Sequence, residues 1–470
     1  MMAARRIAAA VRPLRQLAAT RIARGTAVGF YALAIQLGVQ LLSVPILTKA
    51  WGLAGYGIWV LLFTVPQFLA MADLGLTTVG ANAMIEAMAR GDDRRAERVY
   101  SALRAFTLAS GAVIAGCAAL VTFTLRPAGL EFTGHLPPGE GARAAAWLCL
   151  YATLMLFNGV SLAAFRAADR FASSTFVHTN IGLMENLAAL AVALRGGSLA
   201  QVALTFLLGR LAGTLILSGL LHYTSPWVRR CPWRADPTEL RLMVRPALAA
   251  LLYPVGNAVS LQGAVMVIGA VGGPSAVPAF TVVRTLTRTA LQFVYRFVIA
   301  SMPRYTAYVA RGDDGRAAQL IVLNLVAAAV QILPAAALML TLGQPFIDLW
   351  TEGRITPGFL LIALMVAAMA ANAAWSPLSN LLLSVNRHEG FVVFYVAVSI
   401  ASVTWGAVLA GRWQAEGMAA ALLLLDLAMI GWVWREARRH GLTGGGRLRG
   451  ATLALIHELR PYGHSGKKPS

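Results

Sequence analysis

Long apolar runs separated by short polar turns repeat along the whole chain. Each run holds about 20 residues, the length that an α-helix needs to cross a bilayer. Alternating strands of about ten residues, typical of a membrane β-barrel, are not found in the sequence. The pattern therefore predicts an all-α polytopic membrane protein with twelve spans. We place them at 26–48, 54–76, 100–125, 143–165, 172–194, 198–222, 246–271, 275–302, 317–342, 358–385, 391–411 and 414–434.

The distribution of Arg and Lys gives these spans an orientation. Basic residues collect in the cytoplasmic loops of membrane proteins. With the N-terminus inside, 30 of the 40 basic residues fall in cytoplasmic segments and six in outer loops. The remaining four lie well inside spans: Arg210, Arg284, Arg288 and Arg296. Arg104 and Arg143, at span ends, are counted with the adjoining loops. The prediction is an N-in, C-in protein, and the same bias explains the net charge of +20 without nucleic-acid binding.

A short motif, ARGDD, occurs at 89–93 and again at 310–314, with an offset of 221 positions. Both copies fall on predicted cytoplasmic turns, and six spans separate them. An even number of spans makes the halves parallel repeats, related by a pseudo-twofold axis along the membrane normal. We predict a basic N-tail (1–25), an N-terminal six-helix lobe (26–222), a cytoplasmic linker (223–245), a C-terminal six-helix lobe (246–434) and a basic C-tail (435–470).

The repeated turn itself has a structural interpretation. Gly91 and Gly312 suit the left-handed position after a helix, and the aspartates that follow can cap the next helix. A calcium loop would need more oxygen ligands at alternate positions. Neither the turns nor the three scattered cysteines predict a metal site, and no nucleotide-binding or catalytic motif predicts a cofactor.

The span at 275–302 is unusual because it carries three arginines. At 100° per residue, Arg284, Arg288, Gln292 and Arg296 share an arc of about 120°. A charge at mid-bilayer costs about 3 kcal/mol or more, and a guanidinium can hold phosphate oxygens bidentately. These residues, together with Arg210, are therefore candidates for an anion-binding cavity.

Internal pairing is the alternative explanation for these arginines. The acids well inside the predicted spans are Asp73, Glu185 and Asp426. They can pair with arginines or couple transport to an ion. Three acids cannot neutralise four arginines one to one, although Arg296 can also extend toward the inner interface. Both interpretations stay open at the level of sequence.

The segment VPILTKAWGLAGYGIWVLLFTVPQFLAMADLGLTTVGANAMIEAMARGDDRRA resembles the N-terminal region of bacterial polysaccharide flippases of the oligosaccharide transporter family. A proline-containing first helix, a Gly-x-x-x-Tyr-Gly turn, an Asp-Leu-Gly-Leu segment and a Gly-Asp turn follow in the family's order. The resemblance is strongest over residues 26–125. It implies two six-helix lobes around a central cavity, and alternating access that moves an undecaprenyl-diphosphate-linked oligosaccharide across the membrane. Cationic cavity residues would receive the diphosphate.

The resemblance thus predicts a transporter rather than an enzyme, in the bacterial inner membrane, serving lipopolysaccharide or exopolysaccharide synthesis. Its expected partners are the bilayer, the polyprenyl-diphosphate-linked oligosaccharide, and a polysaccharide polymerase with chain-length machinery. One alternative is a cation-coupled multidrug exporter of the same superfamily, although cationic drugs need carboxylates and the first span contains none. A second alternative is a membrane glycosyltransferase or polysaccharide ligase. Such enzymes need a large outer loop, and the longest here is at 126–142.

Overall fold

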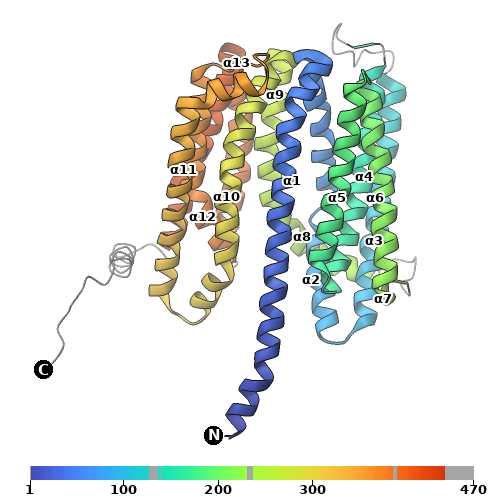
Figure 1. Cartoon of the computed structure of the whole chain (residues 1–470), viewed down its shortest axis with the longest axis vertical. Helices are drawn as coiled ribbons and strands as arrows, with labels where there is room; N and C mark the ends of the chain where they lie inside the picture. Colours follow the sequence, from blue (N-terminus) through green and yellow to red (C-terminus); the bar gives the residue numbers. More distant parts are fainter. Residues whose placement is uncertain (1, 126–135, 138, 230–236, 385–388, 440–470) are drawn as a thin grey trace, which may run out of the picture. The chain divides into compact units, whose positions relative to one another are not determined.

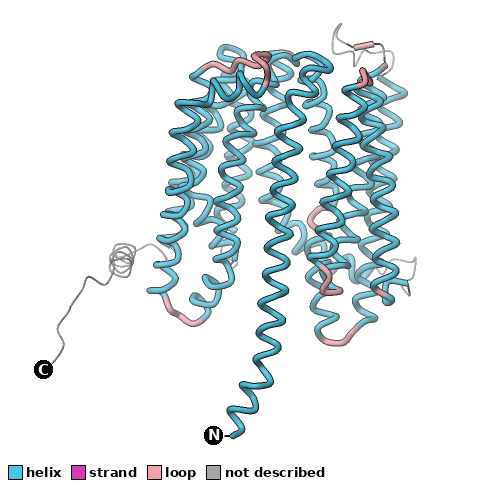
Figure 2. Tube along the Cα trace, in the orientation of Figure 1, coloured by secondary structure: helices cyan, strands magenta, loops and turns pink. Residues whose placement is uncertain are grey.

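A computed structural model describes residues 2–125, 136–137, 139–229, 237–384 and 389–439 of the 470-residue chain. Within these ranges the secondary structure is helical, without strands, and loops are confined to the ends of helices (Figures 1 and 2). The longer helices are α1 (Met2–Leu69), α2 (Leu76–Ala89), α3 (Asp93–Leu125), α4 (Glu140–Ala167), α5 (Phe171–Leu194), α6 (Leu199–Thr224), α8 (Pro237–Ala258), α9 (Ala264–Gly272), α10 (Val277–Ala310), α11 (Asp314–Trp350), α12 (Phe359–Ser384) and α13 (Glu389–Arg439).

The described residues form helices without strands, and many of the helices have bilayer length, which confirms the all-α polytopic prediction. Nine helical segments are long and apolar enough to cross a bilayer. Two of these segments break in the middle, because α1 leaves helical geometry at Gly52 and α13 does so at Trp413 and Gln414. The predicted twelve spans are reached when each broken segment counts as two and the 34-residue α10, which carries three arginines, is added.

One predicted span boundary needs correction. The second span does not run unbroken to residue 76: α1 ends at Leu69, and a 3-10 turn, η1 (Ala70–Asp73), follows. Leu74 and Gly75 then take positive φ values of 50° and 73° before α2 begins. The predicted linker at 223–245 contains the short helix α7 (Pro226–Arg229) and the first residues of α8, while 230–236 lie outside the described residues.

The helices form two compact units, Met1–Leu251 and Leu252–Ser470. In the first unit α4 packs against α3 and α6, and α5 packs against α1 and α6. Glycines bring α5 and α6 close together, since a Cβ atom at Gly213 would lie 2.3 Å from Ile181. In the second unit α12 packs against α10, α11 and α13, around the fully buried side chains of Phe280, Trp375 and Phe391.

The two ARGDD turns have the same local structure, as their sequence predicts. Gly91 and Gly312 have φ values of 73° and 69°, the left-handed conformation of a helix C-cap. The Oδ1 of Asp92 accepts from the backbone N of Arg95 at 3.0 Å, and the Oδ1 of Asp313 accepts from that of Arg316 at 3.1 Å. Each first aspartate therefore caps the helix that follows, which is a structural role.

Candidate functional site

Helix α10 presents two different faces within the second unit. Val282, Val283, Val294 and Val298 are fully buried against the neighbouring helices. Arg284 and Arg288, four residues apart, are half-buried on another face, where they line a polar cavity of about 80 Å³. A cavity of this size holds a few water molecules, and it suits a phosphate head rather than a sugar chain.

The cavity is formed by helices of the second unit only. Its polar lining comes from α8, α10, α12 and α13 and from a short π-helix, η2 (Val259–Gly263), between α8 and α9. The charged lining residues are Arg284, Arg288 and Asp426, so the cavity carries a formal charge of +1. An excess of positive charge favours an anionic ligand.

Arg284 is held at the wall of the cavity by the π-helix. One nitrogen of its guanidinium donates to the backbone carbonyl of Leu261, which lies within η2. The guanidinium carbon also lies 5.5 Å from the ring centroid of Phe280. A π-helix shifts the hydrogen-bond register of a helix and often occurs at functional sites. Here it supplies an acceptor for an arginine inside the membrane.

Asp426 lines the same cavity as Arg288 but accepts its hydrogen bonds from other residues. Its Oδ1 accepts from Asn372 Nδ2 at 2.8 Å and from Trp375 Nε1 at 2.9 Å. The hydroxyl of Tyr295 donates to Asn372 Oδ1 at 3.2 Å, which extends the network back to α10. Arg288 forms no hydrogen bond or ion pair with any described residue. Its guanidinium is therefore available to a ligand.

Gln292 and Arg296 do not line this cavity, although the helical wheel places them on the same arc. Gln292 is half-buried and Arg296 is exposed. The predicted four-residue group on α10 is thus divided: Arg284 and Arg288 lie together with Asp426, and the other two lie elsewhere on the helix.

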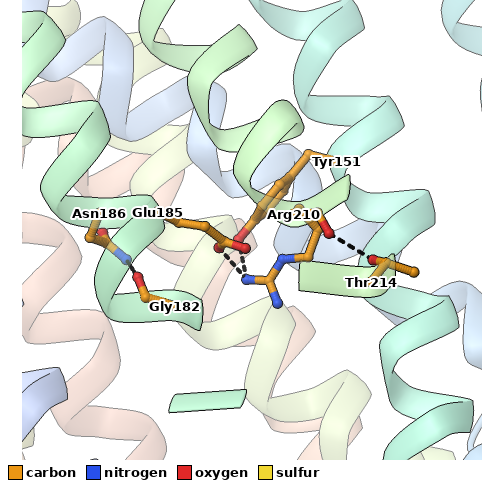
Figure 3. A network of polar contacts seen from close by, with 6 residues as sticks. All are labelled: Tyr151, Gly182, Glu185, Asn186, Arg210 and Thr214. Carbon is orange, nitrogen blue, oxygen red and sulfur yellow. Dashed lines mark hydrogen bonds and ion pairs between the residues drawn. The ribbon is translucent and has the colours of Figure 1, made fainter. Parts of the chain in front are cut away.

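Arg210 belongs to the first unit, where it is buried in a network of its own (Figure 3). Its Nη2 lies 2.6 Å from Glu185 Oε2 and 3.0 Å from the hydroxyl of Tyr151. Only 7% of the Arg210 side chain and 1% of the Glu185 side chain are exposed. Of the two interpretations considered for Arg210, pairing with a buried acid is the one that the structure shows.

Asp73, the third predicted acid, is the last residue of η1, where the second predicted span is interrupted before α2. Its carboxylate accepts from the backbone N of Thr77 at 3.1 Å and from the Thr77 hydroxyl, and so caps α2. It also lines a cavity of about 220 Å³ within the first unit, together with Thr78 and Arg166. No group of three or more His, Cys, Asp or Glu suited to a metal ion occurs among the described residues.

The sequence did not identify the aromatic wall of the cavity in the second unit. The rings of Tyr253 and Tyr395 stack with centroids 5.3 Å apart, and Trp375 lies 5.8 Å from Tyr395. Amphipathic aromatics inside spans were the available signal, but nothing in the sequence shows that residues more than a hundred positions apart meet. Asn257 and Asn372 also line the cavity. Sequence alone did not distinguish such a role from ordinary helix-to-helix bonding.

Solved structures with the same fold are known. An inward-facing multidrug resistance MATE family transporter of the MOP superfamily has a TM-score of 0.66 at 14% identity, with 86% of this chain and 99% of that chain covered. A MOP superfamily transporter from Pyrococcus furiosus, described as having a binding pocket of reversed polarity, has a TM-score of 0.61 at 15% identity, with coverage of 90% and 96%. Lipid II flippase MurJ, in an inward closed conformation, has a TM-score of 0.61 at 11% identity, with coverage of 94% and 93%.

No protein-family model matches the sequence, and no curated protein matches it either. The structural likeness defines the class: a multi-pass membrane protein with the fold of MOP superfamily transporters. The structures named above are transporters and a flippase. At 11–15% identity their likeness establishes the fold, so the substrate has to be argued from the site.

Proposed function

We propose that the protein is a flippase that moves a polyprenyl-diphosphate-linked oligosaccharide across the bacterial inner membrane for surface polysaccharide synthesis. One observation carries the proposal: Arg288, in a membrane span, lines a positively charged cavity and forms no hydrogen bond or close ion pair with a described residue. A charge in that position is costly and marks a functional site in membrane proteins. The fold shared with lipid II flippase MurJ supports a lipid-linked substrate.

The geometry suggests distinct roles for the two cavity arginines. Arg288 is the primary phosphate ligand, because its guanidinium forms no hydrogen bond or close ion pair with a described residue. Arg284 keeps the Leu261 carbonyl as a partner and adds a second positive charge to the cavity beside Arg288. Asp426, fixed by Asn372 and Trp375, balances part of this charge when the cavity is empty. Transport follows by alternating access, with the N- and C-termini on the cytoplasmic side, and a polymerase and chain-length machinery use the translocated lipid.

The second candidate function is a cation-coupled multidrug exporter. The likeness to MATE family transporters favours it. The charge of the cavity in the second unit opposes it, because a cationic drug would meet two arginines and one aspartate. The Pyrococcus furiosus transporter, with its pocket of reversed polarity and suggested different function, shows that pocket charge varies on this fold. A deletion strain with increased susceptibility to several cationic drugs and normal polysaccharide would favour the exporter.

Substitution of the cavity arginines tests the flippase. Arg288→Gln removes a charge-assisted hydrogen bond worth about 1.5–3 kcal/mol, which corresponds to a loss of about ten- to hundredfold in phosphate affinity. We expect little surface polysaccharide and an accumulation of lipid-linked oligosaccharide on the cytoplasmic leaflet. Arg354→Gln is the matched control, since Arg354 is an exposed outer-loop residue that contacts Glu352. Normal polysaccharide in a well-expressed Arg284→Gln/Arg288→Gln strain would disprove the assignment.

A further inference from the structure

A large apolar groove lies between α10 and α11, within the second unit. Its volume is about 770 Å³, and no charged residue lines it. Small residues on both helices line the space: Ala290 on α10, and Ala335 and Gly343 on α11. A methylene group occupies about the volume of a water molecule, about 30 Å³, so the groove has room for about 25 carbons of an extended chain.

The two polar residues of the groove each hydrogen-bond to their own helix. The Thr289 hydroxyl donates to the backbone carbonyl of Thr285 at 2.9 Å. The Gln331 amide nitrogen donates to the carbonyl of Ala327 at 2.8 Å. Both side chains thus return to their own helix, as polar groups in an apolar surrounding must. The groove surface is therefore suited to a hydrocarbon.

The inner end of the groove is close to a cation. Phe293 and Gln331 each lie 17 residues from the turn that joins α10 to α11, or about 25 Å at 1.5 Å per residue. Arg296 follows Phe293 by three residues, nearly one helical turn, and is exposed. It has no hydrogen bond or ion pair with a described residue. Long helical side chains lean toward the preceding turn, which brings the guanidinium within reach of the groove's inner end.

We propose that this groove binds the prenyl chain of a polyprenyl phosphate lipid, with Arg296 on its phosphate. The proposal rests on the function proposed above and specifies where its lipid substrate is recognised. A hydrocarbon groove with one free cation at its end is complementary to a single long chain with an anionic head. The volume exceeds that of one fatty-acyl chain and matches several consecutive isoprene units.

The site explains the division of the arginines on α10. Arg284 and Arg288 line the polar cavity on one face, while the groove occupies another face of the same helix. Arg296 does not line the cavity, and it follows the groove residue Phe293 by nearly one helical turn. One helix thereby carries two separate sites, the polar cavity with Arg284 and Arg288 and the apolar groove with Arg296 near its end.

Binding of a polyprenyl monophosphate to the purified full chain in detergent micelles tests the proposal, with native mass spectrometry as the measurement. Ala335→Trp fills the groove, and Ala337→Trp is its matched control, since Ala337 is exposed on the same helix outside the groove. We expect Ala335→Trp to weaken binding by about tenfold or more and Ala337→Trp to leave it unchanged. Leu338→Ser, at a groove side chain that is 59% exposed, should also weaken it.

Two further measurements test whether the phosphate contacts Arg296 and whether the bound lipid is a prenyl lipid or a phospholipid. Arg296→Gln should weaken binding of the polyprenyl phosphate, whereas Arg354→Gln should not. A dipalmitoyl phosphatidic acid should compete poorly. Equal loss with Ala335→Trp and Ala337→Trp, or equal competition by phosphatidic acid, would overturn the proposal. Because binding is measured without transport, a chain that binds the prenyl phosphate but keeps normal polysaccharide in the Arg284→Gln/Arg288→Gln strain would refute the flippase and leave the groove assigned.

Discussion

The buried ion pair of the first unit allows a quantitative test of the structure. Glu185→Gln removes the charge that faces Arg210, whose side chain is only 7% exposed. Loss of one member of a buried pair costs about 3–5 kcal/mol, because the other charge stays buried without compensation. The Nε of Arg210 and the Oε1 of Glu185 are already buried without a partner among the described residues. No neighbouring group in the described part of the chain is therefore in place to compensate the charge of Arg210 when the Glu185 carboxylate is removed.

Two further variants separate the charge from the packing. Tyr151→Phe deletes the hydroxyl that accepts from Arg210 at 3.0 Å and leaves the ring in place. A hydrogen bond to a charged group is worth about 1.5–3 kcal/mol, so this variant should fall between the wild type and Glu185→Gln. The double variant Glu185→Leu/Arg210→Met replaces both charges by apolar side chains. Such replacements are neutral or stabilising by about 1–4 kcal/mol.

Unfolding of the purified chain by SDS titration in mixed micelles measures these differences while the spans stay in an apolar phase. The expected order of stability is the double variant at or above the wild type, then Tyr151→Phe, then Glu185→Gln. If Glu185→Gln is as stable as the wild type, or the double variant is as unstable as Glu185→Gln, the pair does not have the buried, coupled geometry described here.

Three other variants have outcomes that follow from single contacts. Gly75→Ala should lose about 1–2 kcal/mol from its left-handed conformation alone, and more because the new Cβ would lie 2.8 Å from the carbonyl oxygen of Ala247; SDS titration measures the loss. Asp313→Ala should lose about 1 kcal/mol with its helix cap, by the same measurement. Asp426→Asn keeps an acceptor for its neighbours but removes the negative charge of the cavity, so calorimetry should show inorganic diphosphate binding several-fold more tightly.

Much of the fold follows from the sequence, since apolar runs and their breaks are local signals. The breaks at Gly52 and near Trp413 coincide with gaps between predicted spans. The end of the second span was wrong because helix-forming residues continue through it, and only packing of Gly75 against α8 shows the break. No local sequence pattern predicts the π-helix at 259–263. The residue that bonds to its Leu261 carbonyl is Arg284, which lies 23 residues further along the chain.

The site was predictable only in part. A helical wheel identifies which residues of α10 share a face, and Arg284 and Arg288 were found in this way. It does not show how far neighbouring helices cover that face, so it could not separate Arg296 from the other two. The pairing of Arg210 with Glu185 joins two helices whose relative rotation is set by the close approach at Gly213. That rotation is a property of tertiary packing.

The composition of α10 has a consequence for how the chain enters the membrane during synthesis. Each arginine near the middle of a span opposes insertion by about 2.5–3.5 kcal/mol, so α10 with Arg284 and Arg288 is a poor insertion signal. α10 is not among the helices that are apolar enough to cross a bilayer, whereas α11, which follows it, has a mean hydropathy of 2.2. We expect a nascent chain that ends at Ala310 to leave α10 outside the bilayer, and one that continues through Trp350 to insert both helices as a hairpin. The helix that carries the candidate site therefore depends on its neighbour for delivery, and mutations that make α11 more polar would cause loss of function through failed biogenesis.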